Sequence, residues 1–419
     1  MRIVYVTQRL PFGPGETFVI PEIEALLSRG HELLIVPRLS AEPVVHDHVG
    51  ALVARTRTLP GAFAAAGAVA RALVRHPRRT AWAFWRLRRT RPHRRAFSNV
   101  VATAQGIWLA GVAGAWGADH IHAHWAHLTA TLAMGASDAS GIPWSFTAHR
   151  YDVVLINLLA EKLRSARFGR FIAREMLDRA RPLVGPEAIE RAILLHMGVP
   201  LSRPPVGDMP VRTAPVVLCP ARLAPVKGHS HLLDAAARLM TRGIAFELWL
   251  AGDGPEGGAI RRRIDELGLG DRVRILGMVP HAALLRLYSE RKVDCVVLPS
   301  LDLGGGLHEG ISVALIEAMA HGVPTIGTRT GGLPELLHRG AGVLIPPADP
   351  DALAAALERV LGSAALRSDL ARAGRRRIEE EFDVAEISAE LARRFAEETV
   401  EPRTRDRPRG WRQRVRTLG

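Results

Sequence analysis

A strand–helix alternation that runs twice along the chain constrains the fold more than any other feature of this sequence. The first run starts with an apolar strand at residues 2–7 and a helical pattern at 17–29 that stops before Gly30. The second run starts at 216–219 and continues to residue 382. Strands that alternate with helices pair in parallel. We therefore expect an α/β fold with two Rossmann-like, doubly wound parallel sheets.

A proline-rich stretch at 198–215 separates the two runs and has the composition of a linker. The chain has 419 residues, more than the about 100–200 residues typical of one domain. We expect a first domain at 1–200 and a second domain at 201–395, with a final helix that can return to the first domain. A basic tail at 396–419 follows. Ligands of such sheets bind at the carboxyl ends of the strands, so two edges can face each other across a cleft.

The net charge of +14 is concentrated in two places. Ten arginines and no acid occur between residues 71 and 95, interrupted by Trp82, Phe84 and Trp85, and seven arginines surround Trp411 in the tail. Arginine with interleaved aromatic residues suits an anionic membrane surface, which is the partner that we expect. A solvated arginine-rich face is the alternative. Nucleic acid could bind the same residues but is not expected.

An uncharged stretch at 96–118 is long enough to cross a bilayer. Polar residues and several glycines dilute its hydrophobicity, and a predicted strand follows directly. We therefore expect a buried helix rather than a membrane span. The polar residues are Ser98, Asn99, Thr103 and Gln105.

The two cysteines and the N-terminus indicate the compartment. Cys219 and Cys295 both fall in apolar, strand-like runs, which favours buried free thiols in a reducing environment. The first residues predict a short strand rather than a signal peptide, because Pro11 and the following glycines interrupt the apolar run too early. We expect a cytoplasmic protein that is peripheral at the inner face of the cell membrane.

Two glutamates mark the candidate site in the second half. Glu309 follows a glycine-rich stretch and precedes Gly310, and Glu317 lies eight positions later inside a helical pattern that ends at Gly322. One acid therefore lies in a loop at a helix N-terminus and the other lies within the helix. The free N–H groups at that terminus can bind a phosphate. Carboxylates accept hydrogen bonds from sugar hydroxyls, so phosphate and sugar recognition can meet here.

Two cations follow the first strand of the second half. Arg222 and Lys227 occupy the carboxyl end of that strand, at the same sheet edge as the Glu309 loop. Fixed cations beside a helix N-terminus suit the negative charge that builds on a leaving diphosphate. Two solvated loop cations are the alternative interpretation.

Histidines follow two strands of the first half. His149 ends a strand and would face the cleft, where an imidazole can contact a hydroxyl or polarise a developing charge. His124 is a candidate contact on the acceptor side. Together with His120, His122 and His127 it raises the alternative of a zinc site, but neither cysteine lies nearby, and we expect no metal.

The segment from Gly252 to Gly257 matches G-x-G-x-x-G between a strand and a helix. Pro255 removes a backbone donor from this loop. No acid ends the next strand, where a dinucleotide ribose would need a partner. We expect a tight turn rather than a dinucleotide site.

Several motifs occur in order along the chain. In the first half they are Glu16-Thr17-Phe18, Leu26 to His31, His122-Ala123-His124-Trp125 and Phe146-Thr147-Ala148-His149. In the second half they are Ala221-Arg222-Leu223 with Lys227-Gly228, Leu250 to Pro255, Gly277, Leu298-Pro299-Ser300, Glu309-Gly310 with Glu317-Ala318, and Gly331 to Glu335. With these motifs the second half resembles the retaining glycosyltransferases of family 4, which have the two-Rossmann GT-B fold. The first half resembles the branch of that family that makes exopolysaccharide or colanic acid, and the resemblance covers roughly residues 1–395.

The resemblance implies a role for each catalytic candidate. Glu309 would contact the transferred sugar, and Glu317 would contact the ribose hydroxyls of the nucleotide. Arg222 and Lys227 would hold the diphosphate. His149 would line the donor pocket beside the reacting carbon. The reaction would retain the anomeric configuration by front-face displacement, with the leaving phosphate helping to deprotonate the acceptor.

The resemblance also implies a nucleotide site completed by Gly277, Gly310, Ile311 and Ser312, with no metal and no cofactor beyond the nucleotide-diphosphate sugar itself. The chain departs from the family pattern at three places. Ala221 replaces a frequent glycine, and Ser312 replaces a frequent proline, where serine can cap the helix. The first loop at 13–15 lacks a clean glycine pair.

We therefore expect a hexosyltransferase that moves a sugar from a nucleotide sugar to a glycan or lipid-linked acceptor in surface polysaccharide biosynthesis. A sugar epimerase of the same fold is one alternative. A phosphorylase is disfavoured because residues 343–419 contain no lysine for its cofactor. A non-catalytic basic protein that binds membrane or nucleic acid is the alternative outside the enzymes.

Overall fold

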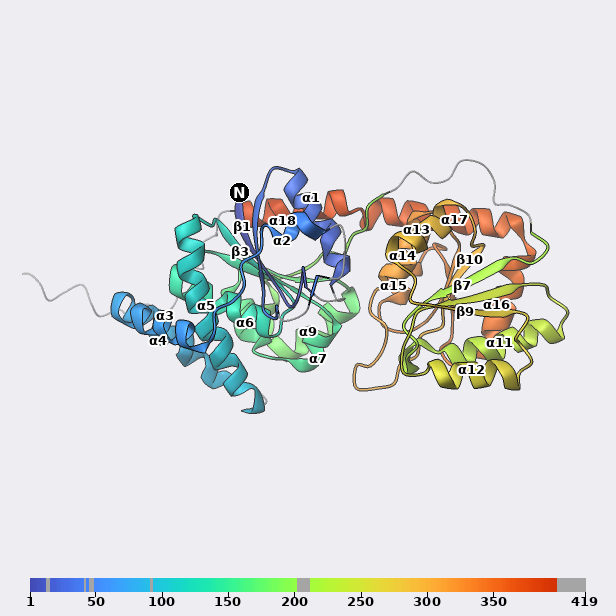
Figure 1. The fold of residues 1–419 in the computed structure, drawn as a ribbon, viewed down its shortest axis with the longest axis horizontal. Helices are drawn as coiled ribbons and strands as arrows, with labels where there is room; N and C mark the ends of the chain where they lie inside the picture. The colour runs from blue at the N-terminus through green and yellow to red at the C-terminus, as the bar shows by residue number, and fades with distance from the viewer. Residues whose placement is uncertain (13–15, 41–42, 45–48, 91–92, 202–211, 398–419) are drawn as a thin grey trace, which may run out of the picture.

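The computed structural model describes residues 1–12, 16–40, 43–44, 49–90, 93–201 and 212–397. It contains two α/β domains, each built around a six-stranded parallel sheet (Figure 1). The two parallel sheets that the alternation predicts are confirmed. The predicted linker falls largely at 202–211, the first glycine-rich loop at 13–15 and the basic tail at 398–419, and these three segments lie outside the described residues.

The first sheet has the strand order β2-β1-β3-β4-β5-β6. Its central strands β1, β3 and β4 are buried along almost their whole length, as expected for parallel strands that helices cover on each side, although β3 carries three histidines. The strands are β1 (Arg2–Thr7), β2 (Glu32–Pro37), β3 (His120–His124), β4 (Trp144–Ala148), β5 (Gly169–Phe171) and β6 (Ala192–Leu194). The helices are η1 (Thr17–Val19), α1 (Ile20–Ser28), α2 (Gly50–Val53), α3 (Ala62–Arg75), α4 (Pro77–Trp85), η3 (Arg86–Arg89), η4 (His93–Arg95), α5 (Ala96–Trp116), α6 (Leu128–Ser140), α7 (Arg150–Leu155), α8 (Leu159–Ser165), α9 (Arg174–Val184) and α10 (Pro186–Ile189).

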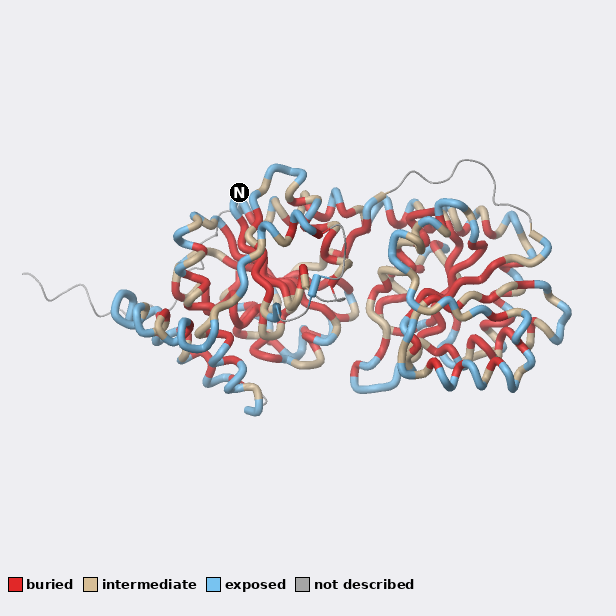
Figure 2. Tube along the Cα trace, in the orientation of Figure 1, coloured by how far each residue is buried: buried red, intermediate tan, exposed pale blue. Residues whose placement is uncertain are grey.

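The second sheet has the order β12-β11-β10-β7-β8-β9. Its strands are β7 (Val216–Pro220), β8 (Glu247–Ala251), β9 (Val273–Gly277), β10 (Cys295–Leu298), β11 (Thr325–Thr328) and β12 (Val343–Ile345). Its helices are η5 (Pro225–Lys227), α11 (His229–Thr241), α12 (Gly257–Glu266), α13 (His281–Ser289), α14 (Val313–Ala320), α15 (Leu333–Leu337), α16 (Pro350–Gly362), α17 (Ala364–Glu381) and α18 (Val384–Ala396). Buried residues concentrate along both sheets (Figure 2), and Cys219 and Cys295 are buried and free, as expected.

The helices α17 and α18 run from the second domain back to the first (Figure 1). The side chain of Arg29, which follows α1, donates to Ser388 of α18, and Phe395 stacks on His120 with ring centroids 4.6 Å apart. The final helix therefore completes the core of the first domain.

The uncharged helix α5 packs along α6. A Cβ atom at Gly106 would lie 2.2 Å from the backbone oxygen of Leu132, so only glycine permits this close approach. The helix buries one face, whereas Phe97, Val100 and Val101 are exposed on another. The stretch His93–Trp116 is the one helix among the described residues whose length and composition would allow a membrane span, and 39% of its apolar 18-residue window is buried.

Hydrogen bonds join the two domains. Arg150 on α7 donates to the backbone oxygen of Gly306, in the loop after β10. The backbone N–H of Arg174 donates to Glu335 on α15 at 2.7 Å. The loop that carries Glu309 therefore contacts the first domain directly.

Candidate active site

A cavity of about 330 Å³ lies between the two domains, and both domains contribute its lining. It brings together six of the residues that the sequence singles out: His149, Lys227, Glu309, Gly310, Ile311 and Ser312. Phe18, Trp125, Arg150 and Tyr151 line the same cavity from the first domain. Aromatic walls with a few convergent polar groups are typical of small-molecule sites.

Glu309 is the acid in this cavity, and two groups hold its carboxylate. Lys227 forms an ion pair with it, and the hydroxyl of Ser300 donates to the same oxygen at 3.1 Å. Only 13% of the Glu309 side chain and 21% of the Lys227 side chain are exposed. The pair is therefore largely shielded from water, and its charges interact more strongly than on an open surface.

Two glycines after β11 set the position of the Glu309 loop. Gly331 has φ +51°, and a Cβ there would lie 1.7 Å from the backbone oxygen of Glu309. A Cβ at Gly332 would lie 2.6 Å from the side chain of Ile311. Sequence reasoning used Gly331 and Gly332 only as part of the resemblance and missed this structural role, which their pairing before a short helix could have suggested.

The N-terminus of α14 lines the cavity with Ser312, Val313 and Ala314. The first N–H groups of a helix have no partner within it, so they present donors and a positive dipole end to an anion. Ser312 occupies the N-cap position, but its side chain makes no capping hydrogen bond. The expectation that serine caps this helix through its side chain is wrong, because the hydroxyl does not accept from the first turn.

Three candidates lie outside this cavity. Arg222 follows β7 and is exposed, and Gly277 ends β9 with φ +66° and accepts from the backbone of Gly252 at 2.8 Å. Glu317 lines a second, more apolar cavity of about 440 Å³, together with Phe18 and residues near 199. The sequence placed Arg222 at the sheet edge of the Glu309 loop and Glu317 inside the helix that follows, but it could not tell which candidates share a cavity with Glu309.

Glu317 is paired with a histidine in this structure. His281 lies with Nε2 2.7 Å from a carboxylate oxygen of Glu317, and this hydrogen bond raises the pKa of His281. Sequence reasoning missed His281.

The G-x-G-x-x-G segment serves packing against the Arg222 loop. A Cβ at Gly252 would lie 2.1 Å from the backbone oxygen of Ala221, and one at Gly254 would lie 2.3 Å from that of Leu223. The glycines therefore let the turn after β8 press against the loop after β7. The expectation of a tight turn is confirmed.

His149 follows β4 and begins α7. Its Nε2 lies 2.7 Å from Nε2 of His124, and Nδ1 of His124 lies 3.1 Å from the hydroxyl of Tyr5. The Tyr5 hydroxyl donates to Glu22 at 2.6 Å, and Arg170 pairs with the other oxygen of Glu22. Burial lowers the pKa of both histidines. His149 is thus the cavity end of a buried hydrogen-bond chain.

Glu22, His122 and His124 have ligand atoms within 4.8 Å of one another, a spacing that a metal ion could use. Their polar atoms already have protein partners: His122 bonds Ser145 and Thr147 at 2.8 and 3.0 Å, and Glu22 faces the Arg170 guanidinium. A cation beside that guanidinium would meet like charge. The donor set fits a hydrogen-bond network rather than a metal.

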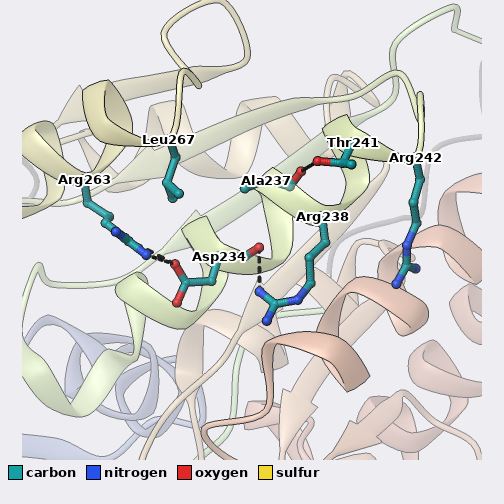
Figure 3. A pocket seen from close by; sticks show the side chains of 7 residues that line it. All are labelled: Asp234, Ala237, Arg238, Thr241, Arg242, Arg263 and Leu267. Atoms are coloured by element: carbon teal, nitrogen blue, oxygen red, sulfur yellow. Dashed lines mark hydrogen bonds and ion pairs between the residues drawn. The ribbon is translucent and has the colours of Figure 1, made fainter.

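A groove of about 420 Å³ lies on the outer surface over α11 and α12 (Figure 3). Its arginines are paired with acids: Arg263 with Asp234 at 2.7 Å, Arg238 with Asp351 at 2.6 Å, and Arg242 with Glu358 at 2.7 Å. An anion would have to break these pairs to bind. The groove is therefore not a candidate anion site.

Residues 210–377 match the sequence profile of the family described as Glycosyl transferases group 1. WcaL of Salmonella typhimurium, named as a colanic acid biosynthesis glycosyltransferase, is 32% identical over 207 residues, which are 48% of this chain and 50% of WcaL. The amylovoran biosynthesis glycosyltransferase AmsK of Erwinia amylovora is 35% identical over 42% of this chain and 45% of AmsK. The chain spans about half the length of these curated relatives.

Solved structures match over nearly the whole chain. Sucrose-phosphate synthase from Thermosynechococcus elongatus superposes with a TM-score of 0.67 at 21% identity, over 94% of this chain and 97% of that one. Anabaena HepE, solved in complex with UDP, gives a TM-score of 0.67 at 17% identity, over 94% of this chain and 99% of that one. Such likeness establishes the fold. Residues 210–377 thus match the glycosyl transferases group 1 family, and the chain as a whole has the GT-B fold.

Proposed function

We propose that this protein is a hexosyltransferase that moves a sugar from a nucleotide-diphosphate sugar to a glycan or lipid-linked acceptor in surface polysaccharide biosynthesis. One observation carries the proposal: a single interdomain cavity holds Glu309, Lys227 and the N-terminus of α14 opposite His149. The names of WcaL and AmsK, both polysaccharide biosynthesis glycosyltransferases, support this class of acceptor. Anabaena HepE, which was solved with UDP-glucose, supports this class of donor.

The proposed donor site lies on the second domain. Lys227 and the N–H groups at the start of α14 supply positive charge to the diphosphate, and Glu309 accepts hydrogen bonds from the transferred sugar. Glu317 contacts the ribose beside His281. Arg222 and Gly277 lie on the same sheet edge outside the main cavity, so Arg222 reaches the diphosphate only by extending from its exposed position.

The proposed reaction retains the anomeric configuration and uses no metal. The bond between the anomeric carbon and the diphosphate oxygen breaks while a bond to the acceptor oxygen forms on the same face. The acceptor proton passes to the leaving phosphate oxygen. Lys227 and the α14 N-terminus stabilise the charge that develops on that oxygen, which is the task a metal ion would otherwise perform.

We further propose that the protein is cytoplasmic and binds the inner face of the membrane through α3, α4 and the start of α5. Phe63 is 95% exposed, Val74 84% and Phe97 79%, and the exposed side chains of Trp82 and Trp85 stack on each other. No acid occurs at residues 49–118. Apolar side chains among arginines suit anionic lipid. Arg86 is excluded from this surface, because it is buried and paired with Asp138 at 2.9 Å.

A screen for nucleotide release tests the proposed activity. Purified protein is incubated with UDP- and GDP-hexoses, with and without a polysaccharide or lipid-linked acceptor fraction. Wild-type protein should release one of the two nucleotides, and Glu309→Gln should reduce release by about a hundredfold. Glu358→Gln, at an acid that pairs with Arg242 of the outer groove, is the matched control. Equal turnover by Glu309→Gln and wild type would contradict the assignment and favour a non-catalytic basic protein.

A further inference from the structure

Trp125 follows β3 with a backbone conformation that is rare for its residue type. Its φ is +83°, in the left-handed region that bulky residues seldom adopt. Such a conformation costs free energy and persists where surrounding contacts enforce it, often at functional sites. The contacts here are a backbone hydrogen bond from Trp125 to the oxygen of Thr147 at 3.0 Å and an indole N–H that donates to the carboxylate of Glu16.

Glu16 is in turn held by the loop after β1. Its carboxylate accepts the backbone N–H groups of Gln8, Arg9 and Leu10 at 3.0, 2.5 and 2.9 Å. Only 6% of Glu16 is exposed. Successive backbone N–H groups that converge on one point form a binding concavity for anions. In this protein an internal carboxylate fills that concavity, so these donors are already satisfied.

The ring of Trp125 forms an aromatic corner with two neighbours. Its centroid lies 4.2 Å from that of His149 and 6.0 Å from that of Phe18, which meets it edge-on at 82°. All three residues line the cavity that holds Glu309 and Lys227 on its other domain. A sugar ring has apolar C–H faces and polar edges, and an aromatic wall beside a few polar groups is the surface that such a ligand needs.

We infer that Trp125, held in place by Glu16, is the platform of the acceptor subsite, and that the acceptor group entering the cleft is an uncharged sugar ring rather than a phosphate. The inference rests on the proposed function and names the acceptor class. The first domain supplies the platform, while the anion-binding groups of the second domain face the donor. Arg150, which the first domain contributes to the described cavity lining, donates to the backbone oxygen of Gly306 and lies over the ring of Tyr151 at 4.3 Å.

The test compares transfer with hydrolysis for the same donor. Wild type, Trp125→Leu and Trp125→Phe are assayed with the nucleotide sugar that the wild type hydrolyses, using methyl pyranosides and, separately, polyprenyl phosphate as acceptors. The ratio of transfer to a methyl pyranoside over hydrolysis should fall at least about tenfold in Trp125→Leu, the scale of one lost anchor contact. Trp125→Phe should recover part of that ratio. Transfer to polyprenyl phosphate should be undetectable in wild type.

A matched control separates this role from general packing. Trp249 on β8 also donates its indole N–H to a glutamate, Glu247, at 3.0 Å, but lies outside the cavity lining. Trp249→Leu should keep the wild-type ratio. The inference is overturned if Trp125→Leu keeps the ratio, if hydrolysis and transfer fall equally, or if polyprenyl phosphate is the better acceptor.

The inference about Trp125 and the proposed transferase activity can be contradicted by different results. If wild-type protein releases no nucleotide from any donor, the proposed activity is wrong, and the platform is then tested by saturation-transfer NMR with methyl pyranosides alone. Saturation of pyranoside protons by wild type and its loss in Trp125→Leu would support a sugar platform. Equal signals from the two proteins would overturn it.

Discussion

His149 and His124 share a hydrogen bond of 2.7 Å between their Nε2 atoms, at the inner wall of the cleft. One ring must donate and the other accept, so the two imidazoles cannot both be charged. Glu22 accepts from Tyr5, which leaves the Tyr5 oxygen to accept from Nδ1 of His124. The chain therefore directs the Nε2 proton of His149 inward and keeps both rings neutral, in agreement with the lowered pKa of each.

Tyr5→Phe should lower the transfer rate by about three- to tenfold, the effect of losing one supporting hydrogen bond. The phenyl ring preserves packing but no longer orders His124. Tyr288→Phe is the control, because the buried hydroxyl of Tyr288 has no hydrogen-bond partner among the described residues. Initial rates and thermal unfolding of both variants are compared. An equal rate for Tyr5→Phe and wild type would show that the chain does not position His149.

Lys227→Met should lower the rate constant of transfer by about 10²–10³-fold, as for other groups that stabilise charge on a leaving oxygen. Inhibition by the product nucleotide diphosphate should weaken in parallel. Lys292→Met removes a lysine that lies outside the cavity lining and should match the wild type. Steady-state kinetics with product inhibition measures both effects. Unchanged inhibition would place the diphosphate elsewhere.

Gly331→Ala should reduce activity by about a hundredfold, because a displaced Glu309 loop misplaces the reacting groups. The added Cβ would lie 1.7 Å from the backbone oxygen of Glu309. Gly340→Ala is the matched control: Gly340 has φ +75° but nothing within 4 Å of a Cβ, so it introduces backbone strain without the clash. The activities are compared at equal folded fraction, so that a difference reports the position of the Glu309 loop and not a loss of folded protein. Similar losses in both variants would mean that strain alone is responsible.

The stability of the fold should fall as the pH drops below about 6.5, the ordinary pKa of histidine. Burial lowers the pKa of His122 and His127 to about 3 and that of His229 to about 4. The unfolded chain therefore binds protons that the native protein excludes. Each such group costs about 1.4 kcal/mol per pH unit until its native pKa is reached.

Urea unfolding at pH 7.5, 6.0 and 5.0 measures this slope. His122→Gln should reduce the slope of the unfolding free energy against pH by the equivalent of about one proton. His76→Gln, at an exposed position, should leave this slope unchanged. A slope that is equal in wild type and His122→Gln would show that His122 is protonated in the native protein.

The helical surface of α3 and α4 should bind anionic vesicles. Replacing Trp82 and Trp85 by serine should lower cosedimentation with phosphatidylglycerol vesicles, and high salt should lower it further by screening the arginines. Met278→Ser, at a residue that is 75% exposed on the other domain, is the control. Removal of the tail after about residue 400 should weaken binding without abolishing donor hydrolysis. If vesicle binding changes neither with salt nor on replacement of Trp82 and Trp85, this surface is not the membrane-binding site.

Local sequence patterns were sufficient for much of the fold and for one wall of the site. Apolar runs and helix stop signals predict both parallel sheets, and the glycine after Glu309 predicts the loop and helix that carry it, because these depend on residues close together in the chain. The three-residue strands β5 and β6 were missed. The histidines near the strand ends were found, but their network was not.

Only the tertiary structure decided how distant segments combine. The hydrogen bond between Glu16 and Trp125 joins residues 109 positions apart, and Gly331 shapes the Glu309 loop from a different strand connection. Sequence alone also placed Arg222 beside Lys227, whereas of these two residues Lys227 lines the cavity and Arg222 does not. Such pairings depend on packing distances of a few ångströms between segments, which composition and spacing do not encode. The sequence thus determined the two-domain architecture, and packing determined which side chains meet in the cleft.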